Sequence, residues 1–138
     1  MREAVADFIN RRDGFDSANG LQADPEHIFL TDGASDGAKR VLNLLIAKKT
    51  DGVMIPIPQY PLSSASIRAF GGTQVNYYPD EENDWALTRD ALENAYNAAT
   101  AQGTDIKVIV VINPGNPTGA ILDAESINEV IAFAKEHQ

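Results

Sequence analysis

A loop of seven turn-forming residues, 113–119, follows directly after a mostly β-branched apolar run at 106–112. Such a run is typical of a strand that is buried on both faces of a parallel sheet. The loop reads Asn-Pro-Gly-Asn-Pro-Thr-Gly, so its prolines fix φ and remove two donors while its glycines relax the backbone. Two asparagine side chains are thus held at the carboxyl end of a strand, the edge where open α/β sheets bind ligands. A plain strand-to-helix connection is the alternative, but two Asn-Pro pairs closed by Thr-Gly favour a binding loop.

The rest of the chain alternates between helical and strand-like patterns. Apolar spacing predicts helices at 2–12, 35–47 and 61–70, another around 92–99, and a last one that begins after Asp123 as its N-cap. Apolar runs predict strands at 27–31, 52–57, 73–78 and 107–112. This alternation predicts an α/β fold with a mostly parallel sheet, forming one domain or part of one.

Composition excludes several classes of function. The 138 residues carry a formal net charge of −9, which would repel nucleic acid and anionic lipid. There is no cysteine, so the chain has no disulfide framework and no thiol nucleophile. No apolar stretch approaches the length of a membrane span, and residues 1–4 lack the apolar core of a signal peptide.

The turn at 31–35 is a second candidate binding element. It reads Thr-Asp-Gly-Ala-Ser and joins a predicted strand to a predicted helix. Free N–H groups and the dipole at a helix N-terminus form an anion site, and the small residues Gly33 and Ala34 allow close approach. Ser35 adds a hydroxyl donor. The alternative is ordinary capping by Ser35 with Asp36 in the first turn, and judged alone the turn favours capping.

Two single side chains complete the set of candidates. Tyr60 lies between Pro58 and Pro61 after a predicted strand, so its stiffly held ring suits stacking on a flat heteroaromatic ring. Packing on the rim of the core is the alternative for this tyrosine. The amide of Asn116 can donate to a phenolate-type oxygen, whereas Asn113 is interpreted as a turn former.

The remaining polar residues carry weaker signals. His27 and His137 lack the spacing of a metal site and are predicted to lie on the surface. The acidic run at 80–82 is predicted to be solvated. We therefore expect no metal ligands in this chain.

The loop at 113–119 resembles the NPxNPTG signature of class I aminotransferases, the pyridoxal-phosphate (PLP) enzymes of fold type I. Further segments resemble the family in the same order along the chain: 31–37, 56–62, 71–73, 77–81 and 110–119. Two segments together are similar to the alanine aminotransferase branch of this family: Asp-Gly-Ala-Ser at 32–35 and Pro-Ile-Pro-Gln-Tyr-Pro-Leu at 56–62. Ser63 departs from this branch, which commonly has tyrosine there.

The resemblance implies that residues 1–138 are a partial large, PLP-binding domain with no second domain, built as part of a three-layer α/β/α sandwich. It implies that Gly33, Ala34 and Ser35 hold the PLP phosphate, that Tyr60 stacks on the ring, and that Asn116 bonds the 3′-oxygen. It also implies that the bond before Pro117 is often cis. Because each element follows a strand, we expect all three to meet in one cleft.

The implied reaction converts L-alanine and 2-oxoglutarate into pyruvate and L-glutamate, in a homodimer located in the cytoplasm or in mitochondria. None of the five lysines lies in a Ser-x-x-Lys context like that of the family's Schiff-base lysine. We therefore expect this chain to carry part of the cofactor cradle, to hold no catalytic residue, and to be inactive alone. The alternative is a non-catalytic PLP-binding, phosphate-binding or interaction module derived from an aminotransferase; an unrelated phosphate-binding α/β protein ranks third.

Overall fold

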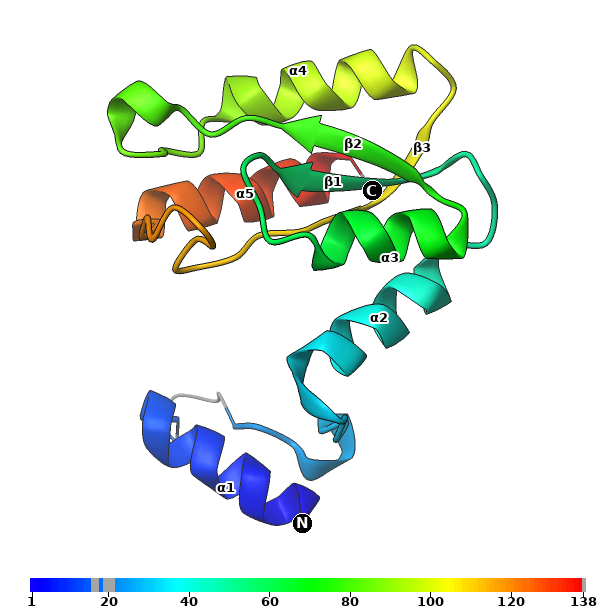
Figure 1. The fold of residues 1–138 in the computed structure, drawn as a ribbon. Coiled ribbons are helices and arrows are strands. Elements are labelled where there is room, and N and C mark those ends of the chain that lie inside the picture. The colour runs from blue at the N-terminus through cyan, green and yellow to red at the C-terminus, as the bar shows by residue number, and fades with distance from the viewer. Residues whose placement is uncertain (16–17, 19–21, 138) are drawn as a thin grey trace. The chain divides into compact units, whose positions relative to one another are not determined.

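The computed structural model describes residues 1–15, 18 and 22–137, and the chain divides into two compact units, 1–37 and 38–138. The first unit begins with α1 (Arg2–Asp13), which ends where Gly14 adopts a left-handed conformation with φ 67° (Figure 1). A short 3₁₀ helix, η1 (Pro25–His27), follows, and the side chain of Asp24 caps it. The helix predicted at 2–12 is confirmed.

The strand predicted at 27–31 is wrong. His27 ends η1, and Ile28 has extended backbone angles, but no described strand pairs with this segment. Phe29 is 86% exposed. A β-branched or aromatic run becomes a strand only where a neighbouring backbone completes its hydrogen bonds, and no described residue does so for this run.

The second unit is built on a parallel three-stranded sheet in the order β2-β1-β3. The strands are β1 (Asp51–Pro56), β2 (Thr73–Tyr77) and β3 (Asp105–Ile109). The helices are α2 (Gly33–Leu45), which continues from the first unit, α3 (Leu62–Phe70), α4 (Arg89–Thr100) and α5 (Ala124–Glu136), with the 3₁₀ turn η2 (Glu81–Asn83) before α4. Asp123 caps α5 as predicted, because its carboxylate accepts the N–H of Ser126 at 2.8 Å.

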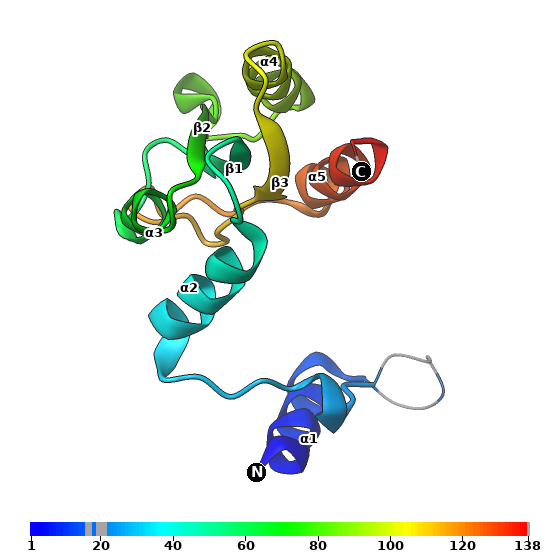
Figure 2. The same ribbon diagram turned by 90° about the vertical axis from the view of Figure 1, so that its right-hand side faces the viewer.

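Helices cover both faces of this sheet. Val53 and Ile55 of β1 are fully buried in a cluster that includes Ile67 of α3. Met54 points to the other face, where its cluster includes Leu92 of α4 and Phe133 of α5. Figures 1 and 2 show α3 on one side of the sheet and α4 and α5 on the other. The predicted α/β fold with a parallel sheet is confirmed as three layers.

The strand predicted at 107–112 ends earlier than expected. β3 stops at Ile109, and Val111 and Ile112 lie beyond it with exposed side chains. The last rung is the N–H of Val110, which donates to the carbonyl of Met54 at 2.9 Å. In this parallel register the next donor would be residue 56 of β1, and Pro56 has no N–H. The proline therefore ends the pairing of β1 with β3.

Candidate functional site

The loop at 113–122 is held by its own hydrogen bonds. The carbonyl oxygen of the Asn113 side chain accepts the N–H of Leu122 at 3.1 Å, which confirms Asn113 as a turn former. Gly115 donates to Ala120 O and accepts the N–H of Gly119, each at 2.8 Å. The peptide bonds before Pro114 and Pro117 are cis. The loop is thus a closed, tight turn.

Asn116 lies at the outer part of this loop with its side chain exposed. Its amide makes no side-chain hydrogen bond to any other described residue, so both its donor and its acceptor are open to a ligand. Gly115 beside it allows the tight turn, because a Cβ at this position would lie 2.5 Å from the Thr118 hydroxyl oxygen. The loop therefore offers one uncommitted amide at the carboxyl edge of the sheet.

Tyr60 follows the neighbouring strand at the same edge. Tyr60 is 56% exposed, so much of its surface is open to a ligand, and packing on the rim of the core stays the alternative interpretation. The preceding residue, Gln59, bonds the hydroxyl of Ser64 in the first turn of α3, which fixes the short connection between β1 and α3. Because β1 and β3 are adjacent and parallel, Tyr60 and Asn116 both follow the carboxyl ends of neighbouring strands.

A small hollow lies beneath the loop. It measures about 50 Å³, and its walls come from the ends of the strands and from the loop itself: Pro56, Pro58, Tyr77, Pro79, Trp85, Leu87, Val111, Ile112, Gly115, Asn116, Thr118, Ala120 and Leu122. Pockets for small-molecule ligands usually measure about 300–1,000 Å³. The hollow is therefore a packing feature under the loop and is too small to be a ligand pocket by itself.

The turn at 31–35 belongs to the first unit. Gly33 begins α2 with φ 82°, and nothing lies within 4 Å of the Cβ it lacks. Its N–H is taken by Thr31 O, whereas the N–H groups of Ala34 and Ser35 have no partner among the described residues. The alternative assumed that Ser35 caps the helix, but Ser35 is the third residue of α2 and therefore is not its N-cap. The Asp36 carboxylate, in the first turn as predicted, accepts the N–H of residue 32 at 3.2 Å. Whether this turn meets the loop at 113–122 stays a prediction.

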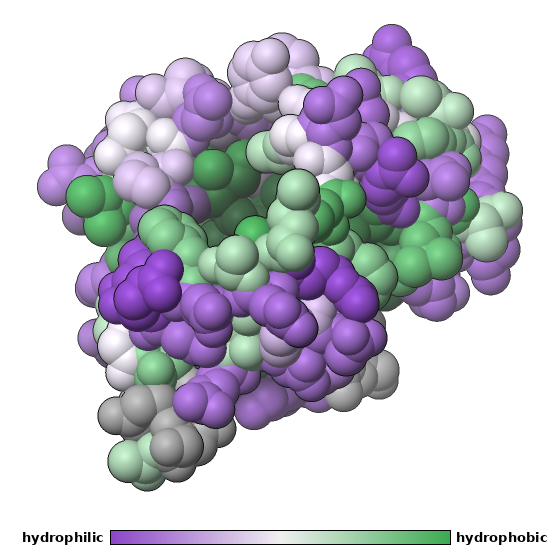
Figure 3. All heavy atoms as spheres, turned by 90° about the horizontal axis from the view of Figure 1, so that it is seen from below, coloured by the Kyte–Doolittle hydropathy of each residue, from purple (hydrophilic) through white to green (hydrophobic). Residues whose placement is uncertain are grey.

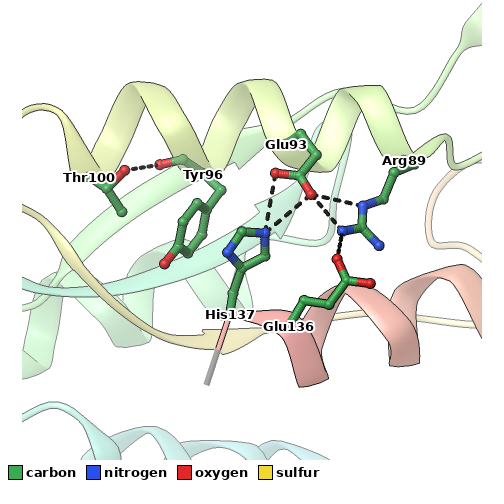
Figure 4. Close-up of polar contacts among 6 residues, drawn as sticks. All are labelled: Arg89, Glu93, Tyr96, Thr100, Glu136 and His137. Carbon is green, nitrogen blue, oxygen red and sulfur yellow. Dashed lines mark hydrogen bonds and ion pairs between the residues drawn. The ribbon is translucent and has the colours of Figure 1, made fainter.

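Sequence reasoning missed a charged and aromatic cluster between α4 and α5 (Figure 4). Glu93 accepts from Arg89 at 2.7 Å, and both of its oxygens lie within 3.2 Å of Nε2 of His137. Arg89 also pairs with Glu136. The pKa of Glu93 is lowered, first by the hydrogen bond from His137 and then by that from Arg89.

His137 is only partly exposed, with 24% of its side-chain surface accessible, whereas His27 is exposed as predicted. The His137 ring is half-buried and lies 4.0 Å from the Tyr96 ring and 4.7 Å from the Phe133 ring, measured between centroids. Its main partners lie some 40 residues away along the chain, so no local pattern could reveal them. The cluster joins the end of α5 to α4.

Large apolar side chains are open on part of the surface. On α2 these include Val41, Leu44 and Leu45. Figure 3 shows hydrophobic side chains exposed among hydrophilic ones on one face of the molecule.

None of the helices in the described part of the chain is long and apolar enough to cross a membrane. Within the same residues, no group of three or more acidic, histidine or cysteine side chains could hold a metal ion.

Comparisons with known proteins agree on one family. The family model described as "Aminotransferase class I and II" matches residues 1–138. A probable mitochondrial alanine aminotransferase of Dictyostelium discoideum is 50% identical over 133 residues, covering 96% of this chain and 24% of the relative. Glutamate–glyoxylate aminotransferase 2 of Arabidopsis thaliana is 47% identical, with 96% and 26% covered.

Solved structures give the same picture. An alanine aminotransferase from Pyrococcus furiosus superposes with a TM-score of 0.80 at 27% identity, covering 99% of this chain and 31% of that one. The chain thus spans about a quarter of the length of the curated relatives named above.

Proposed function

This chain belongs to the class I and II aminotransferases, and we propose that it forms part of the large, PLP-binding domain of an alanine aminotransferase. The family depends on PLP and acts on amino acids and keto acids. The observation that carries the proposal is the rigid loop at 113–119, which presents the uncommitted amide of Asn116 at the carboxyl edge of the sheet. The 50% identity to a probable alanine aminotransferase supports the choice of substrate.

The donors in this chain fit the chemistry of PLP. The cofactor carries an anionic phosphate, a flat aromatic ring and a ring oxygen of phenolate type. The open N–H groups of Ala34 and Ser35 at the N-terminus of α2, a helix of 13 residues, suit the phosphate. The exposed ring of Tyr60 suits the aromatic face, and the amide of Asn116 suits the oxygen.

Each residue would then have a separate task. Gly33 lets the phosphate approach the backbone, because no side chain occupies the space beside its Cα. Tyr60 covers one face of the ring and excludes water from it. Asn116 donates to the ring oxygen and favours its ionised form. When bound, PLP supplies the electron sink for the reaction.

We further propose that the parent protein converts L-alanine and 2-oxoglutarate into pyruvate and L-glutamate as a homodimer, in the cytoplasm or in mitochondria. Two relatives from Arabidopsis thaliana, each 47% identical, are named glutamate–glyoxylate aminotransferases. Glyoxylate is therefore the second candidate for the amino-group acceptor.

The test begins by sequencing the coding region on both sides of these 138 residues and purifying the protein that contains them. We expect PLP-dependent formation of glutamate from alanine and 2-oxoglutarate, measured beside glycine formation from glutamate and glyoxylate. A purified protein that binds PLP but transfers no amino group in either assay would favour the non-catalytic module instead.

The role of Asn116 has its own test within this protein. Asn116→Ala should weaken PLP binding by roughly tenfold to a hundredfold, because hydrogen bonds to charged groups contribute about 1.5–3 kcal/mol. Asn128→Ala, which removes an exposed amide on α5, is the matched control and should leave binding unchanged. Equal affinities for the Asn116→Ala and wild-type proteins would contradict the assignment.

A further inference from the structure

The loop that carries Asn116 begins where one hydrogen bond of the sheet is missing. The N–H of Val110 makes the last ladder bond from β3 to β1, at 2.9 Å to Met54 O. In a parallel ladder the carbonyl of Val110 would next accept from residue 56. Pro56 cannot donate, so the sheet itself leaves this carbonyl without its regular partner.

The phenol of Tyr77 supplies the missing hydrogen bond to Val110 O. Tyr77 is the last residue of β2, on the far side of β1, and is paired with Pro56. Its hydroxyl donates to Val110 O at 2.7 Å, so it reaches past the proline to the strand beyond. The side chain is only 2% exposed, and burial raises the pKa of the phenol, so it stays a neutral donor.

Tyr77 also forms part of the floor beneath the loop. It lines the hollow of about 50 Å³ together with Trp85 and Asn116. Asp84 and Trp85 both have left-handed backbone conformations, with φ of 52° and 62° respectively. The phenol therefore bonds the residue that starts the loop, and its ring lines the hollow beneath the loop.

We propose that Tyr77 is a positioning residue for Asn116. The hydroxyl of Tyr77 replaces the ladder bond that Pro56 cannot make, and it so fixes Val110, from which the loop at 113–122 starts. The effect of this bond on the cofactor rests on the proposed function. Its effect on the order of the loop does not depend on that function, so the two effects can be tested separately.

The first test measures amide hydrogen exchange in the cofactor-free protein. Tyr77→Phe should speed exchange at Gly115, Gly119 and Leu122 by roughly twofold to tenfold, the range that one hydrogen bond supports. Tyr78→Phe removes the hydroxyl of an exposed neighbour and should change nothing. Unchanged exchange in Tyr77→Phe, or equal changes in both variants, would overturn the proposal.

A rescue variant separates positioning from general loosening. In Tyr77→Phe combined with Pro56→Ala, residue 56 regains an N–H that can donate to Val110 O. We expect this double variant to recover the slow exchange of the loop. A double variant that exchanges as fast as Tyr77→Phe alone, or faster, would contradict the proposal, because the restored donor would not replace the phenol.

The second test uses the PLP-bound protein. The pH dependence of the cofactor's absorbance should move in Tyr77→Phe in the same direction as in Asn116→Ala, and should stay at the wild-type value in Tyr78→Phe. A Tyr77→Phe titration identical to wild type would limit Tyr77 to a structural role. If the wild-type protein binds no PLP, the proposed function fails, and the exchange experiment still decides whether Tyr77 positions the loop.

Discussion

Replacing Leu92 with alanine tests the packing of α4 on the sheet. Leu92 is 1% exposed and belongs to the cluster that includes Met54 and Phe133. Leu→Ala changes at such sites cost about 2–5 kcal/mol, because transfer energy is lost and a cavity remains. Small domains have a total stability of about 5–15 kcal/mol, so this one change should remove a large part of it.

Leu44 of α2 offers a matched control. It is 82% exposed, so Leu44→Ala should change the free energy of unfolding by no more than about 0.5 kcal/mol. Both substitutions remove the same atoms from a helix, and only burial differs between them.

Urea denaturation of the 138-residue chain, followed by far-UV circular dichroism, measures both effects. We expect the midpoint to fall strongly for Leu92→Ala and to stay in place for Leu44→Ala. If Leu92→Ala prevents folding altogether, Leu92→Met should cost less than about 1.5 kcal/mol and keeps the comparison measurable. Equal shifts for Leu92→Ala and Leu44→Ala would refute the burial described for Leu92 and the exposure described for Leu44.

Two further predictions concern charged groups. His137 is the largest cause that lowers the pKa of Glu93, so this carboxylate stabilises the fold above its unfolded pKa, and that stability is lost as pH falls through the folded value. Glu93→Gln should therefore flatten the fall in melting temperature on acidification, whereas Glu129→Gln, on an exposed site of α5, should not. Asp51 is 2% exposed and accepts the N–H groups of residues 47–48 at 2.8 and 2.9 Å, so Asp51→Ala should lower the melting temperature at neutral pH.

The features that could be predicted from the sequence are those that a short stretch determines. The start of α5 depends on Asp123 and the N–H three residues later, and both the cap and the apolar spacing lie within that stretch. The same holds for the turn-forming role of Asn113 and for the strand that precedes Tyr60. Each is set by residues close together in the sequence.

Features that depend on distant partners could not be predicted. His137 was expected on the surface, but Glu93, 44 residues earlier, holds it against α4. The run at 27–31 has a strand-like composition and lacks a described neighbour with which to pair. The phenol of Tyr77 bonds a carbonyl 33 residues later, so nothing near Tyr77 in the sequence points to this contact.

Prolines lie both where the pairing of β1 with β3 ends and in the loop that carries Asn116. Pro56 ends the pairing of β1 with β3, and the loop containing Pro114 and Pro117 starts a few residues beyond that point. A residue with an N–H at position 56 could extend the ladder, and the carbonyl of Val110 would then be held by the sheet. With proline there, Tyr77 on β2 holds that carbonyl instead. The position of Asn116 therefore depends on all three strands, because β3 leads into its loop, β1 ends the pairing and β2 supplies the anchor.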